Sequence, residues 1–542
     1  MVDREKLGHW APPRKNASSG PYLFHPAAPM RRRTRIWGSI STTLLAPTTN
    51  GENKDSRLSF LIPGRLRMMV RRFVSIAAVL LTTGTGIAQR NWEPLPDEKD
   101  AVAAIRAKGG MVYFGPQGKA VSFSIFSRSF GDADLANLTR LSAVEKILFD
   151  STSISDNGLK YLLPFKKLKI LDVSNAAVTD KGLETLGQIA TLENIELRGA
   201  KITPAGLRHL ASLKHLVSFS CEGAQAGDEG LRILARHTDL RYLRIGGKIS
   251  ESGVASLAGL TKLEGLVLPK GTLDDRCLAQ LKRLTNLRSL MSLGNINDEG
   301  LSCLENMTRM ESLNLKEAKV TDSGLRYLRQ MGRLRTLYLP SAGVTDLGMA
   351  HLEGLTNMGV LDLSGTHVGD AGLKHLSKMT KLSYLYLART CVTDAGAKEL
   401  AKLTSLTHLD LRETKISDKG LAALSPLTRL VQLELATTAI SDQGLAALSP
   451  LTNLEYLDLA RTAISDKGLA ALSPLTNLEH LVLTGTAVTN AGLPHLESFQ
   501  KLRVLGVYRT KVTENEAMKL RKVLKGLMHI DVDRHRDPTD PW

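Results

Sequence analysis

Carboxylate side chains recur at a fixed spacing in the C-terminal half of the sequence. Asp410, Glu434 and Asp458 lie 24 residues apart, and His408 and His480 share another position of the same frame. Two carboxyl groups about 5 Å apart could act as the acid and the nucleophile of a retaining glycoside hydrolase. Histidines brought together could bind a metal ion. Whether either chemistry is possible depends on the elements that position these side chains.

The 24-residue frame is an internal repeat. Residues 451–474 (LTNLEYLDLARTAISDKGLAALSP) match residues 427–450 at 18 of 24 positions. The first leucine-like position of the frame can be followed from Val144 to Leu502. A fixed period of this length predicts a solenoid, in which stacked coils bury leucines that one coil alone could not.

Each coil is expected to contain one short strand. Leu454, Leu457 and Leu459 are apolar, whereas Tyr456 and Asp458 alternate with them. This period of two predicts a strand that buries one face and leaves the other open.

A short helix is expected to follow each strand. Asp466 is predicted to cap the helix of its own coil, in which Leu469 and Leu472 point inward. One carboxylate per coil does not supply the converging oxygens that calcium requires. Gly468 indicates close packing rather than a phosphate-binding loop.

The repeat resembles the leucine-rich repeat superfamily over residues 120–532, through its L-x-x-L-x-L strand and T-x-I-T-D-x-G-L-x-x-L tail. It looks like the ribonuclease-inhibitor-like and cysteine-containing subclasses, the latter found in F-box substrate receptors, and like repeat arrays of exported bacterial proteins. The resemblance implies a right-handed α/β horseshoe solenoid with a parallel β-sheet on its concave face and short helices on its convex face.

The chain departs from the family at one position after the strand, where many members carry Asn or Cys. Here the residue is threonine, and we expect its hydroxyl to bond loop backbone between coils. These residues are Thr366, Thr390, Thr414, Thr438, Thr462, Thr486 and Thr510.

The stacking of the coils argues against both the glycoside hydrolase and the metal-site interpretations. His408 and His480 would lie three coils, or roughly 15 Å, apart, which is too far to share one metal ion. Asp410, Glu434 and Asp458 would be about 5 Å apart, but an open strand face offers no water-excluding pocket. We therefore expect no enzymatic activity, no metal site and no cofactor.

The outward strand positions instead predict a binding surface for a protein or peptide, because aromatic and arginine side chains concentrate binding energy. The acidic residues among them favour a basic or polar segment. Earlier coils, with Ser218, Ser220, Gly265 and Ser289, offer poor anchors. The candidate residues are Tyr338, Tyr384, Tyr386, His408, Asp410, Glu434, Tyr456, Asp458 and His480 on strands, and Arg389, Arg412, Arg461, Tyr508 and Arg509 at the loop edge.

The net charge of +17 is concentrated at the N-terminus, because residues 1–88 hold 14 Lys/Arg and 4 Asp/Glu. No basic stripe with stacking aromatics appears elsewhere, so we expect no nucleic-acid partner. Cys221 is expected to be a buried small hydrophobe. Cys277 and Cys303 lie on neighbouring coils and could be paired or free.

The N-terminal segments suggest export. Residues 1–67 are either disordered or precede the true start near Met68. Residues 68–88 resemble a signal peptide, with Arg71 and Arg72, an apolar run over 73–81 and a small-residue cleavage site. That run is too short for a stable membrane span. Residues 89–119 are predicted to form a helix-hairpin cap, 120–513 the repeats, and 514–542 a C-terminal cap and tail.

These observations predict an exported, non-enzymatic protein-binding scaffold. One alternative is an intracellular substrate-receptor adaptor resembling F-box leucine-rich repeat proteins, although no F-box-like helical module precedes the array. Another is a structural envelope protein. The oligomeric state is left open.

Overall fold

The structure, a computed structural model, describes residues 94–115, 118–291 and 294–532. The chain divides into two units, Met1–Arg90 and Asn91–Trp542, and every described residue belongs to the second unit. The predicted disordered start and signal peptide, residues 1–88, lie outside the described residues.

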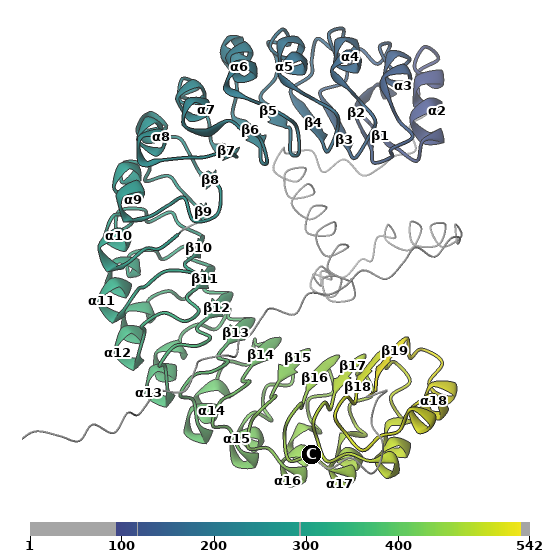
Figure 1. The fold of residues 1–542 in the computed structure, drawn as a ribbon, viewed down its shortest axis with the longest axis vertical. Helices are drawn as coiled ribbons and strands as arrows, with labels where there is room; N and C mark the ends of the chain where they lie inside the picture. The colour runs from purple at the N-terminus through teal and green to yellow at the C-terminus, as the bar shows by residue number, and fades with distance from the viewer. Residues whose placement is uncertain (1–93, 116–117, 292–293, 533–542) are drawn as a thin grey trace, which may run out of the picture. The chain divides into compact units, whose positions relative to one another are not determined.

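The described unit is an α/β solenoid built on one open sheet (Figure 1). Strand β1 pairs antiparallel with β2, and from β2 to β19 each strand pairs in parallel with the next along the chain. The strands are β1 (Met111–Phe114), β2 (Ala120–Ile125), β3 (Lys146–Asp150), β4 (Ile170–Ser174), β5 (Asn194–Glu196), β6 (Ser218–Cys221), β7 (Tyr242–Ile245), β8 (Gly265–Val267), β9 (Ser289–Met291), β10 (Ser312–Asn314), β11 (Thr336–Tyr338), β12 (Val360–Asp362), β13 (Tyr384–Tyr386), β14 (His408–Asp410), β15 (Gln432–Glu434), β16 (Tyr456–Asp458), β17 (His480–Val482), β18 (Val504–Gly506) and β19 (His529–Asp531).

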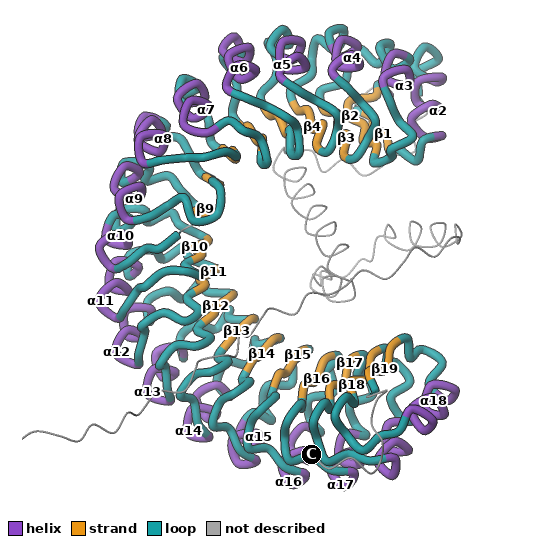
Figure 2. Tube along the Cα trace, viewed as in Figure 1, coloured by secondary structure: helices purple, strands orange, loops and turns teal. Residues whose placement is uncertain are grey.

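Short helices occupy the other side of the coils, as Figure 2 shows. The α-helices are α2 (Lys99–Ala107), α3 (Asp132–Ala136), α4 (Asp156–Leu159), α5 (Asp180–Leu186), α6 (Pro204–Leu207), α7 (Gly227–Leu234), α8 (Glu251–Ala255), α9 (Asp275–Leu281), α10 (Asp298–Ser302), α11 (Asp322–Leu325), α12 (Asp346–Met349), α13 (Asp370–Leu373), α14 (Asp394–Leu400), α15 (Asp418–Ala423), α16 (Asp442–Leu445), α17 (Asp466–Leu469) and α18 (Glu514–Val523). The 3₁₀ helices are η3 (Lys160–Leu162), η4 (Arg208–Ser212), η5 (Ser256–Gly259), η6 (Arg326–Leu328), η7 (Ala350–Leu352), η8 (Lys374–Leu376), η9 (Ala446–Leu448), η10 (Ala470–Leu472) and η11 (Asn490–Leu496). None of the helices among the described residues is long and apolar enough to cross a bilayer.

The core runs between the strands and the helices. Leu457 is fully buried and lies in register with Leu433 and Leu481 of the neighbouring strands. Leu469 and Leu472 are also fully buried, so the predicted inward positions of the coil are confirmed. Because each leucine is enclosed by its own coil and both neighbours, burial couples adjacent coils.

The prediction that each aspartate caps its own helix is wrong. In α17 the cap is Ser465, whose hydroxyl accepts a hydrogen bond from the Lys467 N–H. The Asp466 carboxylate instead accepts two hydrogen bonds from Thr489 of the next coil, from its N–H at 2.7 Å and its hydroxyl at 2.6 Å. The N-cap lies one residue before the aspartate, so Asp466 is the first residue of the helix and its carboxylate is available to bond the next coil.

The geometry of this link recurs from coil to coil and explains the glycine two residues after each aspartate of the repeat. A Cβ on Gly468 would lie 2.3 Å from Asp442 Oδ1 of the preceding coil. The close-packing interpretation of this glycine is therefore confirmed, and the packing partner is the same carboxylate that joins the coils.

The threonines after the strands bond within their own coil, so the prediction that they bond between coils is wrong. Thr462 Oγ1 donates to the Leu459 carbonyl at 2.6 Å, and Thr414 Oγ1 donates to Leu411 in the same way. Each hydroxyl closes the turn that follows its own strand. The link between coils comes from the aspartates.

At the N-terminal end, helix α2 and the β1–β2 hairpin occupy the segment in which a helix-hairpin cap is predicted. Cys221 is fully buried, as expected of a small hydrophobe. Cys277 and Cys303 are free thiols.

Candidate functional site

The parallel register sorts the outward side chains of the strands into two columns. The first strand column contains Tyr384, His408, Tyr456 and His480. The second strand column, two residues further along each strand, contains Tyr338, Tyr386, Asp410, Glu434 and Asp458. The strand residues predicted as anchors therefore lie on one face of the sheet.

Aromatic rings pair within the first strand column. Tyr384 stacks on His408 of the next strand, with ring centroids 4.1 Å apart and an angle of 11° between the rings. Tyr456 and His480 form a looser pair at 5.9 Å. Burial lowers the pKa of His480, which favours its neutral form. His408 is buried, with 5% of its surface exposed, so the accessible rings of this column are the half-buried ones of Tyr384, Tyr456 and His480.

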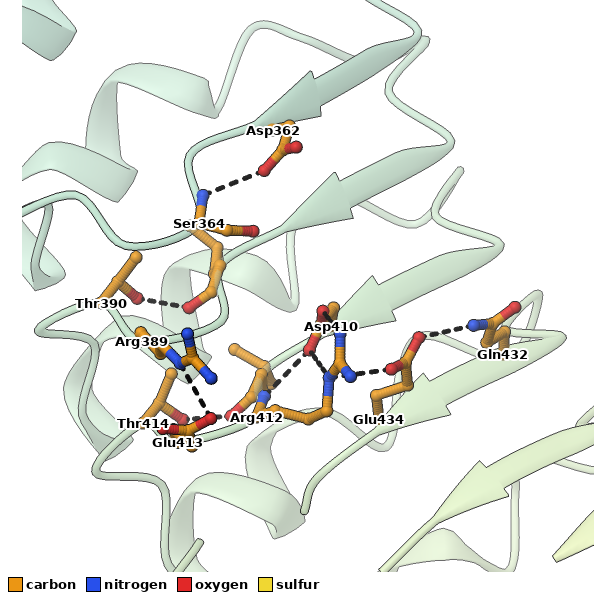
Figure 3. Close-up of polar contacts among 12 residues, drawn as sticks. Asp362, Ser364, Arg389, Thr390, Asp410, Arg412, Glu413, Thr414, Gln432 and Glu434 are labelled. Carbon is orange, nitrogen blue, oxygen red and sulfur yellow. Dashed lines mark hydrogen bonds and ion pairs between the residues drawn. The ribbon is translucent and has the colours of Figure 1, made fainter. Parts of the chain in front are cut away.

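A charged cluster occupies the second strand column (Figure 3). The Arg412 guanidinium donates to both carboxylate oxygens of Asp410, at 2.9 Å from Nε and 2.6 Å from Nη2. Its Nε also lies 2.9 Å from Glu434 Oε2, and Gln432 donates to Glu434 Oε1 at 2.6 Å. Arg412 was predicted at the loop edge, but its head group lies over the sheet between β14 and β15.

Asp458 extends the carboxylate row to β16. Its Oδ1 accepts a hydrogen bond of 2.9 Å from the Ala460 N–H, and no ion pair to it occurs within the described residues. Burial raises the pKa of Asp458, and the Asp410 charge adds to this effect. Three carboxylates therefore lie on consecutive strands, and the one guanidinium among them bonds only Asp410 and Glu434.

Burial, and to a smaller extent the surrounding negative charge, raises the pKa values of the neighbouring groups. Burial, together with the charge of Asp410, raises the pKa of Glu434 to about 7. Burial also raises the pKa of Tyr386 to about 12, with smaller contributions from Tyr338, Tyr384 and the acidic groups. The cluster is desolvated and negative, which favours added positive charge.

One position of the repeat, at the loop edge that follows each strand, has a left-handed backbone; we call this set of residues the loop column. Arginine occupies it in several coils. Arg389, Arg461 and Arg509 have φ angles of 57°, 53° and 54°. The equivalent residues Gly365 and Gly485 have φ angles of 69° and 71°. A side chain in this left-handed region costs of order 1 kcal/mol or more, so arginine here is not favoured by the fold.

The arginines of the loop column differ in their partners. Arg389 Nε lies 2.9 Å from Glu413 Oε1, and Arg509 lies over the Tyr508 ring at 5.5 Å. Arg461 has no ion pair among the described residues.

The predicted residues are not all close together. Tyr338 on β11 contacts Lys316, whose Nζ lies 5.0 Å from its ring centroid. Tyr508 and Arg509 follow β18, seven strands from β11 at about 4.8 Å per strand. The compact group is Tyr384, Tyr386, His408, Asp410, Arg412, Glu434, Tyr456, Asp458 and His480.

Sequence reasoning missed charged residues on the N-terminal part of the same face. Lys146 on β3, Asp172 on β4, Glu196 on β5 and Arg244 on β7 take outward strand positions. Burial raises the pKa of Asp172 to about 6. Applying the period-two frame to every coil, rather than only to coils rich in tyrosine, would have found them.

The described residues contain no group of three or more His, Cys, Asp or Glu side chains placed to hold a metal ion. His408 and His480 lie on β14 and β17, three strands apart. The carboxylates of the second strand column contact a guanidinium and backbone N–H groups, an arrangement suited to recognising positively charged groups.

Comparisons with known proteins agree with the repeat pattern. A family model described as a leucine-rich repeat region matches residues 333–535, and a second leucine-rich repeat model matches residues 166–187. No curated protein matches the sequence significantly.

Several solved structures are similar. An internalin from Listeria monocytogenes is 25% identical, covers 66% of this chain and 89% of its own, and has a TM-score of 0.45. A plant peptide hormone receptor, RGFR1, in complex with RGF2, is 15% identical over 73% of this chain and 68% of its own, with a TM-score of 0.46. A complex of TLR13 with ssRNA13 is 18% identical over 76% of this chain and 62% of its own, with a TM-score of 0.45.

Proposed function

We propose that this chain, which belongs to the leucine-rich repeat superfamily, is a non-enzymatic scaffold that binds a protein or peptide on the strand face of β13–β17. The main support is the compact group of outward aromatic and charged side chains on that face. These side chains have no role in the core, because the inward positions of the same strands are filled by buried leucines such as Leu409 and Leu457.

The chemistry of the face favours a polypeptide ligand. Tyr384 presents a half-buried ring that stacks on the buried His408, and Tyr456 lies one strand beyond Gln432 in the same column. Aromatic rings bury large areas at little cost in conformational entropy. Carboxylates on three consecutive strands would repel the phosphates of a nucleic acid, so a nucleic-acid ligand is disfavoured.

The loop column borders the same face. Its left-handed position carries Arg389 and Arg461, and other coils carry Ser341, Glu413 and Thr437 there, so the strain belongs to the repeating turn. The arginines of this column add positive charge at the edge of the face, where a ligand that extends beyond the strands would meet them.

The decisive experiment is a double substitution, Tyr384→Ala with Tyr386→Ala. We expect partner binding to weaken at least tenfold, since two anchors of about 1–2 kcal/mol each are lost, with the unfolding midpoint little changed. The partner would be obtained by pull-down and its affinity measured by calorimetry. Tyr242→Ala on β7 is the matched control, because Tyr242 is an exposed tyrosine outside β13–β17. Unchanged affinity in the double variant would place the site elsewhere.

Export is proposed as the setting of this function. The basic, apolar and small-residue order of residues 68–88 supports it. N-terminal sequencing of the native protein should find a start near Gln89 and no peptides from residues 1–67; recovery of such peptides would contradict the proposal.

A further inference from the structure

The carboxylate row of β14–β16 carries more negative charge than the chain itself neutralises. Arg412 bonds Asp410 and Glu434 and leaves Asp458 without an ion pair in the described part of the chain. Strands β11 to β18 carry no lysine or arginine, so no other cation comes from the sheet itself. An additional positive group would therefore be attracted to the Asp458 end of the row.

Arg412 shows what kind of group this row accepts. Its guanidinium is held by both oxygens of Asp410 and by one oxygen of Glu434. Paired oxygens in this arrangement match the planar fork of a guanidinium better than the point charge of an ammonium. The same row thus already binds one guanidinium in the folded chain.

Asp458 is more than nine-tenths buried, with 8% of its surface exposed. Of its two carboxylate oxygens, Oδ1 accepts a hydrogen bond from the Ala460 N–H. Tyr456 precedes it by two residues, so its ring lies beside the carboxylate on the same face. A carboxylate next to an aromatic ring binds arginine through charge and through stacking.

From these contacts we infer that Asp458, Glu434 and Tyr456 form a subsite for one arginine side chain of the bound protein or peptide. This inference rests on the proposed function and adds the chemical identity of one ligand residue. The incoming guanidinium pairs with Asp458 and interacts with the Glu434 charge from the side opposite Arg412.

Binding at this subsite should release a proton. Burial and the Asp410 charge raise the pKa of Glu434 to about 7, so this carboxyl is partly protonated at neutral pH. The charged groups around it are Asp410 and Arg412 from the β14 side and Asp458 from β16, with the phenols of Tyr386 and Tyr456 nearby. A cation at Asp458 lowers the pKa of Glu434 and should therefore bind more tightly as pH rises through 7.

The test uses two blocked octapeptides, acetyl-(Gly-Arg)4-amide and its counterpart with citrulline, a neutral isostere, in place of arginine. We expect the arginine peptide to bind at least tenfold more tightly by calorimetry. Its affinity should rise up to about tenfold from pH 6 to pH 8, the limit for one group with a pKa near 7.

Substitutions localise the effect. Asp458→Asn should reduce affinity for the arginine peptide at least fivefold, and Glu434→Gln should abolish most of the pH dependence. Glu196→Gln, the same change in the second strand column on β5, should leave both properties unchanged. The unfolding midpoint of each variant is measured to confirm that it folds. If either Asp458→Asn or Glu434→Gln fails to fold, the other still tests the subsite.

Equal affinity for both peptides, or full affinity in Asp458→Asn, would overturn the subsite. If the subsite fails in this way while the Tyr384→Ala and Tyr386→Ala double variant still loses the natural partner, the proposed function stands without it. A loss of arginine-peptide binding in Glu196→Gln would also overturn the assignment, because the binding would then be a general effect of the acidic face.

Discussion

The N-terminal strands β3–β7 and the C-terminal strands β13–β17 share one scaffold but carry different outward chemistry. In β3–β7, Lys146 and Arg244 stand on the same face as Asp172 and Glu196. In β13–β17 the strands carry acidic, tyrosine and histidine side chains but no lysine or arginine, and Arg412 comes from the loop. Both regions bury their inward leucines fully, as at Leu171 and Leu457. The core side chains and the proposed binding side chains therefore lie on opposite sides of the same strands.

The loop column differs less between the two regions than the strands do. Its left-handed position is occupied by Ser151, Asn175 and Gly199 in N-terminal coils and by both Gly365 and Arg389 in C-terminal coils. The same turn therefore accepts glycine and non-glycine residues in each region. The C-terminal coils differ in that several of these positions carry an arginine at the edge of the face.

The largest expected effect tests whether the leucine cores of the two regions are packed equally well. Leu457→Ala and Leu171→Ala should each cost about 2–5 kcal/mol, through lost burial and a cavity. Urea denaturation would measure both. A difference of more than about 1 kcal/mol between them would show that the two regions are not packed alike.

The next effect tests the link between coils. Asp466→Ala should cost about 2–3 kcal/mol, because the Thr489 N–H and hydroxyl lose a charged acceptor. Asp180→Ala should cost the same, since Thr203 bonds Asp180 with the same two groups. Ser465→Ala, which removes only a helix cap, should cost about 1 kcal/mol. If Asp466→Ala cost no more than Ser465→Ala, capping rather than linkage would be its role.

A pH titration should separate the acidic groups of the two regions. The pKa of Asp172 is raised to about 6 and that of Glu434 to about 7. A carboxyl whose pKa is higher in the folded state binds its proton more tightly there, so stability falls as pH rises through the window between the two values. That window runs from 3.8 to about 6 for Asp172, and from 4.5 to about 7 for Glu434.

The matched variants are Asp172→Asn and Glu434→Gln, each measured by urea denaturation between pH 4 and pH 8. Asp172→Asn should remove the fall in stability between pH 3.8 and about 6. Glu434→Gln should remove the fall in stability between pH 4.5 and about 7. Identical pH profiles for the two variants would contradict the separate environments.

The smallest effect concerns the loop column. Arg461→Gly should change stability by less than about 1 kcal/mol, in the stabilising direction, because relief of the positive φ is partly offset by the entropy of glycine. Gly199→Ala, with φ of 79°, should be destabilising by about 1 kcal/mol. Thermal melts of both variants would test this, and a clear loss in Arg461→Gly would mean that Arg461 stabilises the fold.

The 24-residue repeat was sufficient to predict the solenoid, the buried leucines and the outward face of the strands. These depend on period and polarity, which are local properties of the chain. The candidate residues could be assigned to one face for the same reason, because a parallel register carries side chains at one position of the frame into one column.

The partners of the polar side chains could not be predicted in this way. Asp466 was assigned to its own helix and Thr462 to a neighbouring coil, and the structure exchanges these roles. Arg412 was placed at the loop edge and turns back onto Asp410 and Glu434. Each of these contacts depends on a one-residue shift in the helix start or on a single side-chain rotamer. Neither feature changes the 24-residue period, so the period could not predict them. The repeat determines which residues face outward, whereas the stacking of coils decides which of them meet.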